Sequence, residues 1–523
     1  MTHTAADLVA GALARSGVVA LPNLSGNHIM SFYTALERSG VRLVHTRHEA
    51  AAVHVADAVA RLTDRPCPAL VTAGPGFANT PGALYTALQA QSPVVLLAGA
   101  IEEALLGRPA FQAMDQVAMS RDLGIPARLV RASTALADVG WAFRGADRGV
   151  PSPRALHLCA DVGRRTIPEP VRAIAMRARR RHADAASIRT TIDALRRARR
   201  PLIVGGPVLA RGAGRALLRR SEEIGIPAVA LESPRGLGDP GLGGVRDVLR
   251  EADAIAFVGK PFDFAIGYGQ APSVAGNARL VRLAEGRSGP GSLAPSTHPT
   301  LALTALLDAC DVDRQADGGW LARTRDLRDW RPAVPDAPSA GAIHPGRIGL
   351  VVERALRESD VLVADGGEFS QWVQAFVRRP ERVLNGPAGA IGGALPFAIG
   401  ARLARPDARI IAISGDGAVG FHLAEFETAA RENLPFVLLV GNDRLWNAES
   451  VIQSRFGGPP LRSLDLSAAR YDQAAIALGG YGERVETEPD LIPAIERALA
   501  SGKPALVEVA ILPVPAPSYA PTV

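Results

Sequence analysis

An aspartate between two glycines, Gly415-Asp416-Gly417, follows the short apolar run 409–413. Glycines beside an acid at the end of a buried strand let the backbone approach a phosphate group closely, and the carboxylate can bind a hard cation such as Mg²⁺. A second oxygen ligand should come from the end of the next strand, and Asn442 follows the apolar run 435–440. The spacing therefore predicts a site for a diphosphate held through a divalent cation. A plain turn is the alternative, because the same tripeptide occurs in many proteins of alternating strands and helices.

A second chemically capable acid is Glu49, which closes a strand-like run and opens an alanine-rich segment, 49–52. A carboxylate in the first turn of a helix is favoured by the helix dipole, so a structural role is one interpretation. A buried acid at this point could also exchange protons with a bound group. The residue alone leaves both interpretations open.

Strand-like runs alternate with amphipathic segments along the whole chain, which predicts an α/β fold of parallel sheets flanked by helices. We expect three domains, because 523 residues are too many for one core. The boundaries that we predict are 1–165, 185–325 and 340–511, followed by an extended Pro-rich tail, 512–523. The predicted strands fall into three groups: 69–72 and 93–98; 201–204, 254–258 and 279–283; and 361–364, 409–413 and 435–440.

Composition is that of an ordinary globular protein, with 47% hydrophobic and 21% charged residues. The net charge of +6 rests almost entirely on arginines spread along the chain, so we expect no nucleic-acid partner. The one dense basic run, 177–182, is interpreted as a solvated linker or helix face, with an anion-binding surface as the alternative.

The three cysteines are too few and too widely spaced for a disulfide framework or a CxxC metal site, and we interpret Cys67, Cys159 and Cys310 as structural thiols. The opening residues lack the basic and apolar regions of a signal peptide, and no segment has eighteen uninterrupted apolar residues. We therefore expect a cytoplasmic protein without a membrane partner.

The combination of strand, Gly-Asp-Gly, helix, strand and asparagine resembles the signature of thiamine diphosphate-dependent enzymes. The resemblance implies that Asp416, the Asn442 side chain and the backbone carbonyl of Arg444 bind Mg²⁺, which bridges the diphosphate. It also places three neighbours against the cofactor, namely Gly415, Gly417 and Ala418. The family's usual Asn-Asn pair is changed here, because Gly441 stands in the first position.

Two further segments resemble the same family. Asp365-Gly-Gly-Glu-Phe follows a predicted strand where the family places a loop that contacts the diphosphate, which implies contacts from Gly367, Glu368 and Phe369. The segment that begins at Gly389 resembles the one whose bulky apolar residue wedges the cofactor into a bent shape. Ile391 would be that wedge, and a core isoleucine between glycines is the alternative.

The first third of the chain is similar to acetolactate synthase, 2-hydroxyacyl-CoA lyase and benzaldehyde lyase in the segments 46–52, 71–79 and 111–118. This resemblance implies a pyrimidine-binding domain, a middle domain and a diphosphate-binding domain, in that order. It makes Glu49 the acid that exchanges a proton with the cofactor's N1′ atom. It also implies a homodimer or homotetramer in which each site takes Glu49 from one subunit and Asp416 from another. Further cofactor contacts implied in this segment come from Gly74, Pro75 and Asn79.

Residues near the reacting carbon should select the substrate. By position, His28 resembles a histidine of benzaldehyde lyase that handles the substrate hydroxyl, with an ordinary surface or core histidine as the alternative. Gln112 matches a glutamine that faces the reacting group, and Trp446 with Asn447 should line the pocket.

The middle part of the chain departs from acetolactate synthases, because 261–265 lacks the arginine that those enzymes use to orient a second 2-oxo acid. Relatives also carry FAD or ADP in this domain, and Gly205-Gly206 alone is too little to support either.

The sequence thus predicts a carboligase or lyase that acts on 2-oxo acids, 2-hydroxy ketones or related carbonyl compounds. Alternatives are a 2-hydroxyacyl-CoA lyase and an acyl-CoA or 2-oxo acid decarboxylase. A non-catalytic regulatory subunit of the same fold would be marked by loss of Glu49 or Asp416, and both are present.

Overall fold

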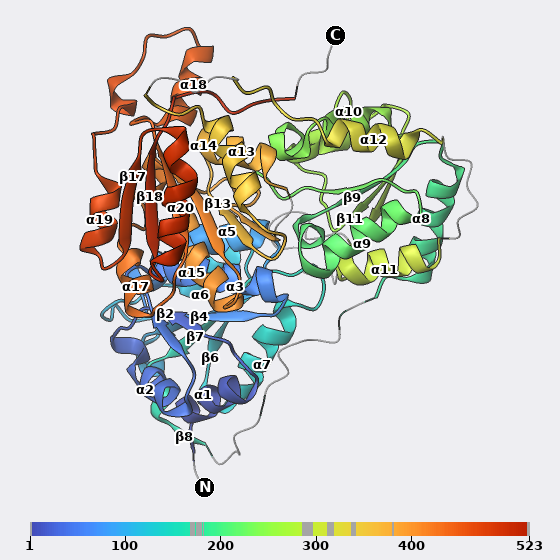
Figure 1. Cartoon of the computed structure of the whole chain (residues 1–523). Helices are drawn as coiled ribbons and strands as arrows, with labels where there is room; N and C mark the ends of the chain where they lie inside the picture. The colour runs from blue at the N-terminus through green and yellow to red at the C-terminus, as the bar shows by residue number, and fades with distance from the viewer. Residues whose placement is uncertain are drawn as a thin grey trace. The chain divides into compact units, whose positions relative to one another are not determined.

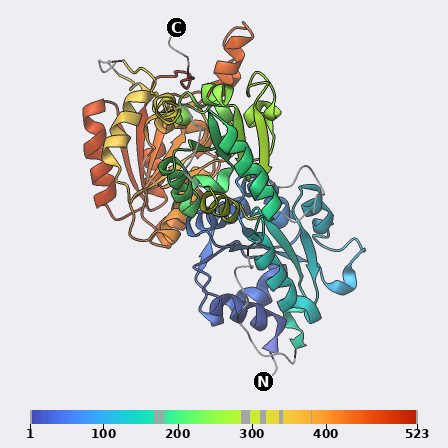
Figure 2. The ribbon, with the colours of Figure 1, turned by 90° about the vertical axis from the view of Figure 1, so that its right-hand side faces the viewer.

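A computed structural model of the chain describes residues 3–519, apart from 168–172, 174–179, 181, 285–296, 311–317, 336–340, 379 and 380. Within these residues the chain forms three parallel sheets, of six, four and six strands, and one short antiparallel pair. Helices flank the strands of each sheet (Figures 1 and 2). The predicted α/β class is therefore confirmed.

The first sheet has the strand order β3-β2-β4-β5-β7-β6, and all of its pairs are parallel. Helix α3 (Glu49–Thr63) is the longest helix of this region and is buried along most of its length. The core of the sheet packs aliphatic side chains and Phe32 and Phe143 against one another. The strands are β2 (Leu21–Asn23), β3 (Leu43–His45), β4 (Cys67–Val71), β5 (Val94–Ala100), β6 (Ala127–Val130) and β7 (Arg154–Cys159). The helices are α1 (Ala5–Arg15), α2 (Met30–Ser39), α4 (Pro75–Ala78), α5 (Pro81–Gln89), α6 (Gln116–Asp122) and α7 (Ala135–Ala146).

The second sheet is smaller, with the order β10-β9-β11-β12. The predicted strands 201–204 and 254–258 coincide with β9 and β11, which are apolar and fully buried, as expected for a sheet covered on both faces. The predicted strand 279–283 coincides with β12, which carries two arginines and is partly exposed. The strands are β9 (Pro201–Gly205), β10 (Ala228–Ala230), β11 (Ala254–Val258) and β12 (Arg279–Leu283). The helices around them include α8 (Ala185–Arg197), α9 (Gly212–Glu223) and α11 (Pro299–Asp308).

The third sheet has the order β14-β13-β15-β16-β18-β17 and is parallel throughout. Because β15 and β16 are neighbours in register, the residues that follow them emerge at the same edge of the sheet. The strands are β13 (Val361–Ala364), β14 (Glu381–Leu384), β15 (Ile410–Gly415), β16 (Val437–Asn442), β17 (Tyr481–Val485) and β18 (Ala505–Ala510). The helices are α13 (Pro345–Ala355), α14 (Glu368–Phe376), α15 (Ala394–Ala404), α16 (Asp416–Val419), α17 (Glu425–Arg431), α18 (Asn447–Arg455), α19 (Tyr471–Ala477) and α20 (Leu491–Ala500).

The chain divides into two compact units. The first comprises Met1–Leu231, Asp253–Pro261 and Asn277–Asp317, and the second comprises Glu232–Ala252, Phe262–Gly276 and Gly318–Val523. The first and second sheets belong to the first unit, and the third sheet belongs to the second unit. The domain boundaries predicted from the sequence stay predictions, and parts of the segments between the predicted domains, 166–184 and 326–339, lie outside the described residues.

The Pro-rich tail runs without helix or strand across the second unit as far as residue 519, and its last four residues lie outside the described part. Trp372 donates its indole N–H to the carbonyl of Pro515 at 2.9 Å. The ring of Tyr519 meets Trp330 edge-on, with 5.5 Å between the ring centroids. The described part of the tail is thus bound to its own unit.

The sequence analysis also made predictions about the cysteines, the basic run and membrane-spanning segments. All three cysteines are buried and lie outside any disulfide, which agrees with the interpretation as structural thiols. Most of the basic run 177–182 lies outside the described residues. Arg180, which is described, forms ion pairs with Asp64 at 2.9 Å and Asp147 at 3.0 Å. Among the helices that the structure describes, none is long and apolar enough to cross a membrane.

Candidate active site

A cavity of about 250 Å³ opens at the carboxyl edge of the third sheet, entirely within the second unit. Its walls come from the ends of β13, β15 and β16, from the loop before α15 and from the start of α18. This is the edge at which open parallel sheets usually bind ligands. The predicted residues that line it are Gly367, Glu368, Phe369, Gly389, Ile391, Gly415, Asp416, Gly417, Ala418, Trp446 and Asn447.

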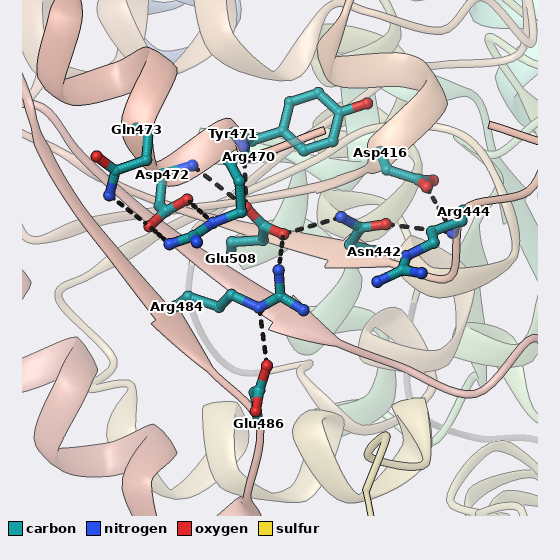
Figure 3. A network of polar contacts seen from close by, with 10 residues as sticks. All are labelled: Asp416, Asn442, Arg444, Arg470, Tyr471, Asp472, Gln473, Arg484, Glu486 and Glu508. Atoms are coloured by element: carbon teal, nitrogen blue, oxygen red, sulfur yellow. Dashed lines mark hydrogen bonds and ion pairs between the residues drawn. The ribbon is translucent and has the colours of Figure 1, made fainter. Parts of the chain in front are cut away.

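Two of the predicted metal ligands converge beside this cavity. The backbone N–H of Arg444 donates to Oδ2 of Asp416 at 2.8 Å and to Oδ1 of Asn442 at 3.2 Å, so both oxygens face one point (Figure 3). Burial raises the pKa of Asp416 to about 6. It also raises the pKa of Asp443 to about 7, to which the nearby charge of Asp416 contributes. A divalent cation fits this donor set, because hard oxygen ligands suit Mg²⁺ and a cation would compensate the buried negative charge.

The third predicted ligand, the carbonyl of Arg444, already accepts a hydrogen bond from the N–H of Leu466 at 2.7 Å. A carbonyl oxygen has two lone pairs, so one remains for a cation. Arg444 itself has a φ of +58°, in the left-handed region, which turns the chain sharply after β16. This turn brings the Arg444 N–H back toward Asp416 and Asn442.

The glycines around Asp416 have two different roles. A Cβ atom added at Gly415 would meet nothing within 4 Å, and the same is true at Gly367. Both positions line the cavity, so its backbone is open to close approach by a diphosphate. Gly417 differs, because a Cβ there would lie 2.8 Å from the Trp446 ring. Gly417 is therefore required for the packing of Trp446.

Gly441, where the family has an asparagine, is explained by its neighbours. A Cβ at this position would lie 2.6 Å from the ring of Phe369 and 2.8 Å from Cδ1 of Ile511. Phe369 is one of the predicted cofactor contacts, and its ring fills the space that a larger residue at position 441 would need. Gly441 therefore leaves room for the Phe369 ring.

We expect Gly441→Ala to lower the free energy of unfolding by about 1–3 kcal/mol, because overpacking forces neighbours off their preferred positions. Urea unfolding followed by circular dichroism measures this. Gly415→Ala is the matched control, since it adds the same methyl group to the same cavity with no neighbour within 4 Å. Adding Phe369→Ala to Gly441→Ala should cost less than the sum of the two single changes. A Gly441→Ala protein as stable as the parent would show that the Phe369 ring does not need the glycine.

A buried acid that the sequence analysis did not select holds the loop of Ile391. Asp365 is 1% exposed and accepts hydrogen bonds from the N–H of Gly392 at 2.9 Å and from the Ser414 hydroxyl at 3.1 Å. Burial raises its pKa to about 6. A Cβ at Gly366 would lie 2.8 Å from Cγ2 of Ile391, so this glycine admits the isoleucine. A charged residue at the end of an apolar strand was the available signal in the sequence.

Glu368 lines the cavity, but its carboxylate is already bound within the protein. It forms an ion pair with Arg235 and accepts the backbone N–H of Ala516 in the tail. Arg235 also lines the cavity and was not predicted. Glu368 therefore anchors Arg235 and the tail at the cavity wall, and Gly367 leaves its backbone open beside it.

In the first unit, Glu49 is the first residue of α3 and is 9% exposed. Nδ2 of Asn79 donates to Oε2 of Glu49 at 2.9 Å. A Cβ at Gly76 would lie 3.3 Å from Oε1 of Glu49, so the short helix α4 passes close to the carboxylate. The start of α3 and the short helix α4 together fix the position of the acid. Asn79, predicted as a cofactor contact, is a direct partner of Glu49.

His28 and Gln112 lie together in the same unit. His28 sits in a short 3₁₀ turn (Asn27–Ile29) and is 7% exposed, and its ring lies close to the Gln112 side chain. Burial lowers the pKa of His28 below its usual 6.5. Gln112 has a φ of +60°, and its backbone lies against Gly74, where a Cβ would approach the Gln112 carbonyl to 2.7 Å. Gly74 thus supports the turn that carries Gln112.

The sequence analysis did not predict a hydrogen-bond network centred on Gln116. Gln116 accepts the N–H of Gly74 at 2.8 Å, donates to the carbonyl of Gly99 at 2.9 Å, and contacts Nδ1 of His157 at 3.0 Å. His157 is fully buried, and burial lowers its pKa to about 4. Gln116 and His157 also line a separate cavity of about 450 Å³ in the first unit. The network ties the Gly74 loop to β5 and β7.

Gly206 and the segment 261–265 were singled out in the middle part of the chain. A Cβ at Gly206 would lie 2.2 Å from the carbonyl of Gly259, so close packing after β9 and β11 explains this glycine. In 261–265 Asp263 accepts the N–H of Ala265 at 3.0 Å, and no arginine stands in the segment.

Two parts of the chain match known protein families. Residues 365–509 match the family described as "Thiamine pyrophosphate enzyme, C-terminal TPP binding domain", and residues 3–119 match "Thiamine pyrophosphate enzyme, N-terminal TPP binding domain". The chain belongs to the thiamine pyrophosphate enzyme family, whose cofactor is thiamine diphosphate. The convergent oxygens and most residues that line the cavity lie in the C-terminal region, 365–509. Glu49, His28 and Gln112 lie in the N-terminal region, 3–119.

Several curated relatives are similar over nearly their whole length. The chain is 31% identical to the acetolactate synthase large subunit of Mycobacterium tuberculosis, over 97% of this chain and 96% of that protein. It is 31% identical to 2-hydroxyacyl-CoA lyase 2 of Bos taurus, over 98% and 90%. It is 30% identical to 2-hydroxyacyl-CoA lyase 2 of Homo sapiens, over 96% and 89%. Relatives with two different activities are thus equally similar to this chain.

Proposed function

We propose that this protein is a thiamine diphosphate- and Mg²⁺-dependent carboligase or lyase that acts on 2-oxo acids, 2-hydroxy ketones or related carbonyl compounds. The observation that carries the proposal is the convergence of Asp416 and Asn442 oxygens beside an open cavity at the carboxyl edge of the third sheet. When bound, thiamine diphosphate supplies a carbon nucleophile that stabilises negative charge next to a carbonyl.

In this proposal the second unit holds the cofactor. Asp416, Asn442 and the Arg444 carbonyl bind Mg²⁺, and the open backbone at Gly415 and Gly367 receives the diphosphate. Further contacts come from the rest of the predicted set: Phe369, Gly389, Gly417, Ala418 and Trp446. Ile391 shapes the cofactor, and the hydrogen bonds of Asp365 keep its loop in place.

The first unit supplies the proton chemistry. Glu49 exchanges a proton with the cofactor's N1′ atom, while Asn79 holds one oxygen of the carboxylate. Gly74 and Pro75 begin the short helix α4, which passes close to this acid. His28 orients the substrate oxygen and moves its proton, and Gln112, whose side chain lies close to His28, helps to orient the same oxygen.

We also propose a homodimer or homotetramer whose sites combine Glu49 of one chain with Asp416 of another, as the family resemblance implies. Light scattering measures the assembly, and a monomer at working concentration that is fully active would contradict it.

Two observations bear on the class of substrate. The absence of an arginine in 261–265 favours an acceptor less acidic than a second 2-oxo acid. A 2-hydroxyacyl-CoA lyase is the second candidate, supported by the relatives that carry that name at 30–31% identity.

A substrate panel tests both candidates. The purified protein, loaded with thiamine diphosphate and Mg²⁺, is incubated separately with 2-oxo acids, acyloins and 2-hydroxyacyl-CoA thioesters, and the products are identified by mass spectrometry. Ligated hydroxy ketones or cleaved acyloins support the leading proposal, and an aldehyde with an acyl-CoA fragment supports the second. No turnover of any class by cofactor-loaded protein would contradict the proposed function.

A further inference from the structure

A single charged residue, Glu508, lies in the middle of the otherwise apolar strand β18 and is 1% exposed. Its register partners are Val440 on β16 and Arg484 on β17. Since alternate residues of a strand point to the same face, Glu508 shares a face with Asn442, two residues after Val440. A buried carboxylate is costly unless hydrogen-bond donors surround it.

Both carboxylate oxygens of Glu508 are occupied (Figure 3). Oε1 accepts Nδ2 of Asn442 at 2.9 Å and lies 3.6 Å from Nη1 of Arg484. Oε2 accepts the backbone N–H groups of Tyr471 at 2.9 Å and Asp472 at 3.3 Å, which begin α19. Two of these donors are backbone N–H groups, which can only donate, and both oxygens of Glu508 act as acceptors.

The amide of Asn442 is therefore forced into one of its two orientations. Because Glu508 accepts, Asn442 must turn Nδ2 toward it, and Oδ1 then points the opposite way. On that side lie the Arg444 N–H, at 3.2 Å, and Asp416. An amide turned by 180° would present N–H groups, which cannot bind a cation.

We propose that Glu508 is a positioning residue that fixes the Asn442 amide with its oxygen toward Mg²⁺. The inference rests on the proposed metal site and extends it to a strand further along the sheet. A purely structural role, capping α19 and pairing with Arg484, is the competing explanation. The two differ in what a change of Glu508 does to the orientation of Asn442.

Glu508→Gln separates them. Its one oxygen must serve the fixed N–H groups of Tyr471 and Asp472, so its amide NH₂ faces Asn442. Asn442 should then rotate to accept that N–H, which turns its own Nδ2 toward the metal position. We expect Mg²⁺ to bind about 10- to 100-fold more weakly, the usual cost of losing an outer partner of a ligand. The measurement is calorimetric titration of Mg²⁺ into protein with saturating thiamine diphosphate.

A donor and acceptor swap tests orientation directly. In the double variant Asn442→Asp with Glu508→Gln, position 442 has two oxygens, so one can accept from the glutamine while the other faces Mg²⁺. The double variant should recover most of the affinity lost in Glu508→Gln. Asn442→Asp alone should be worse than the double variant, because it sets two carboxylates against each other. Glu483→Gln is the matched control on neighbouring β17, where the carboxylate pairs with Arg497, and it should bind Mg²⁺ normally.

Three outcomes would overturn the proposal. The first is an unchanged Mg²⁺ affinity in Glu508→Gln, and the second is a double variant that binds Mg²⁺ no more tightly than Glu508→Gln does. The third is loss of folding in both the single and the double variant, because the double variant conserves the hydrogen bond between the two side chains. Parent protein that binds thiamine diphosphate with no dependence on Mg²⁺ is a distinguishable result. It would overturn the proposed metal site itself, and the role of Glu508 with it.

Discussion

Glu49→Gln is expected to slow turnover by about 10²–10⁴-fold, the usual contribution of a positioned acid–base group, while thiamine diphosphate binding stays close to normal. Glutamine keeps the size of glutamate, its oxygen can still accept the hydrogen bond from Asn79, and its amide can still bond to N1′. It cannot pass a proton back and forth. Exchange of the cofactor's C2 proton should therefore slow together with turnover.

The measurement is hydrogen–deuterium exchange at C2 of the bound cofactor, followed by acid quenching and NMR, beside a calorimetric titration of the cofactor. His28→Ala is the contrasting variant. His28 acts on the substrate in our proposal, so its loss should lower turnover while C2 exchange stays near normal. Fast C2 exchange in Glu49→Gln would mean that Glu49 is only a first-turn residue of α3 and that the activating acid lies elsewhere.

Asp416→Ala should weaken Mg²⁺-dependent binding of thiamine diphosphate by about 100-fold or more. It removes a metal ligand outright, whereas loss of an outer-shell partner alone costs about 10- to 100-fold. Asp416 is also the only acidic side chain among the three proposed ligands. Removing it leaves the amide oxygen of Asn442 and the Arg444 carbonyl, both neutral, to hold a divalent ion.

Asp407→Ala is the control for Asp416→Ala, because Asp407 is exposed in the turn before β15 and touches none of the proposed ligands. Circular dichroism should show both variants folded. An Asp416→Ala protein that binds the cofactor as tightly as the parent would show that the Gly-Asp-Gly segment is an ordinary turn.

Much of the fold could be predicted because each central strand is a compact apolar run. The predicted strand at 409–413 lies within one residue of the start of β15, and the one at 435–440 overlaps most of β16. The approach of Asp416 to Asn442 followed from the same pattern, because carboxyl ends of neighbouring parallel strands share an edge. In both cases the local sequence pattern was enough to predict the structure.

The partners of these residues could not be predicted in the same way. Glu508 meets Asn442 only because β18 pairs with β16 in a particular register, 66 positions apart in the chain. Arg235 reaches Glu368 across 133 positions. Such contacts depend on packing between distant segments, which strand patterns leave undetermined.

Gly441 shows the boundary between the two cases. The sequence shows a glycine at the position where the resembled signature has the first asparagine of its Asn-Asn pair. The reason for the glycine is steric and lies in side chains distant in the sequence. The Phe369 ring and Ile511, from other parts of the chain, occupy the space beside it. Comparison with a motif identifies the unusual residue, and the folded structure identifies the side chains that occupy the space beside it.

The most direct test of the account is a calorimetric titration of the unmodified protein with thiamine diphosphate, once with Mg²⁺ and once after removal of divalent ions with EDTA. We predict saturable binding with Mg²⁺, with one cofactor per chain, and a loss of that binding in EDTA that added Mg²⁺ reverses. Absence of binding with Mg²⁺ present, in protein shown to be folded, would contradict the central claim that the cavity at Asp416 and Asn442 is a thiamine diphosphate site.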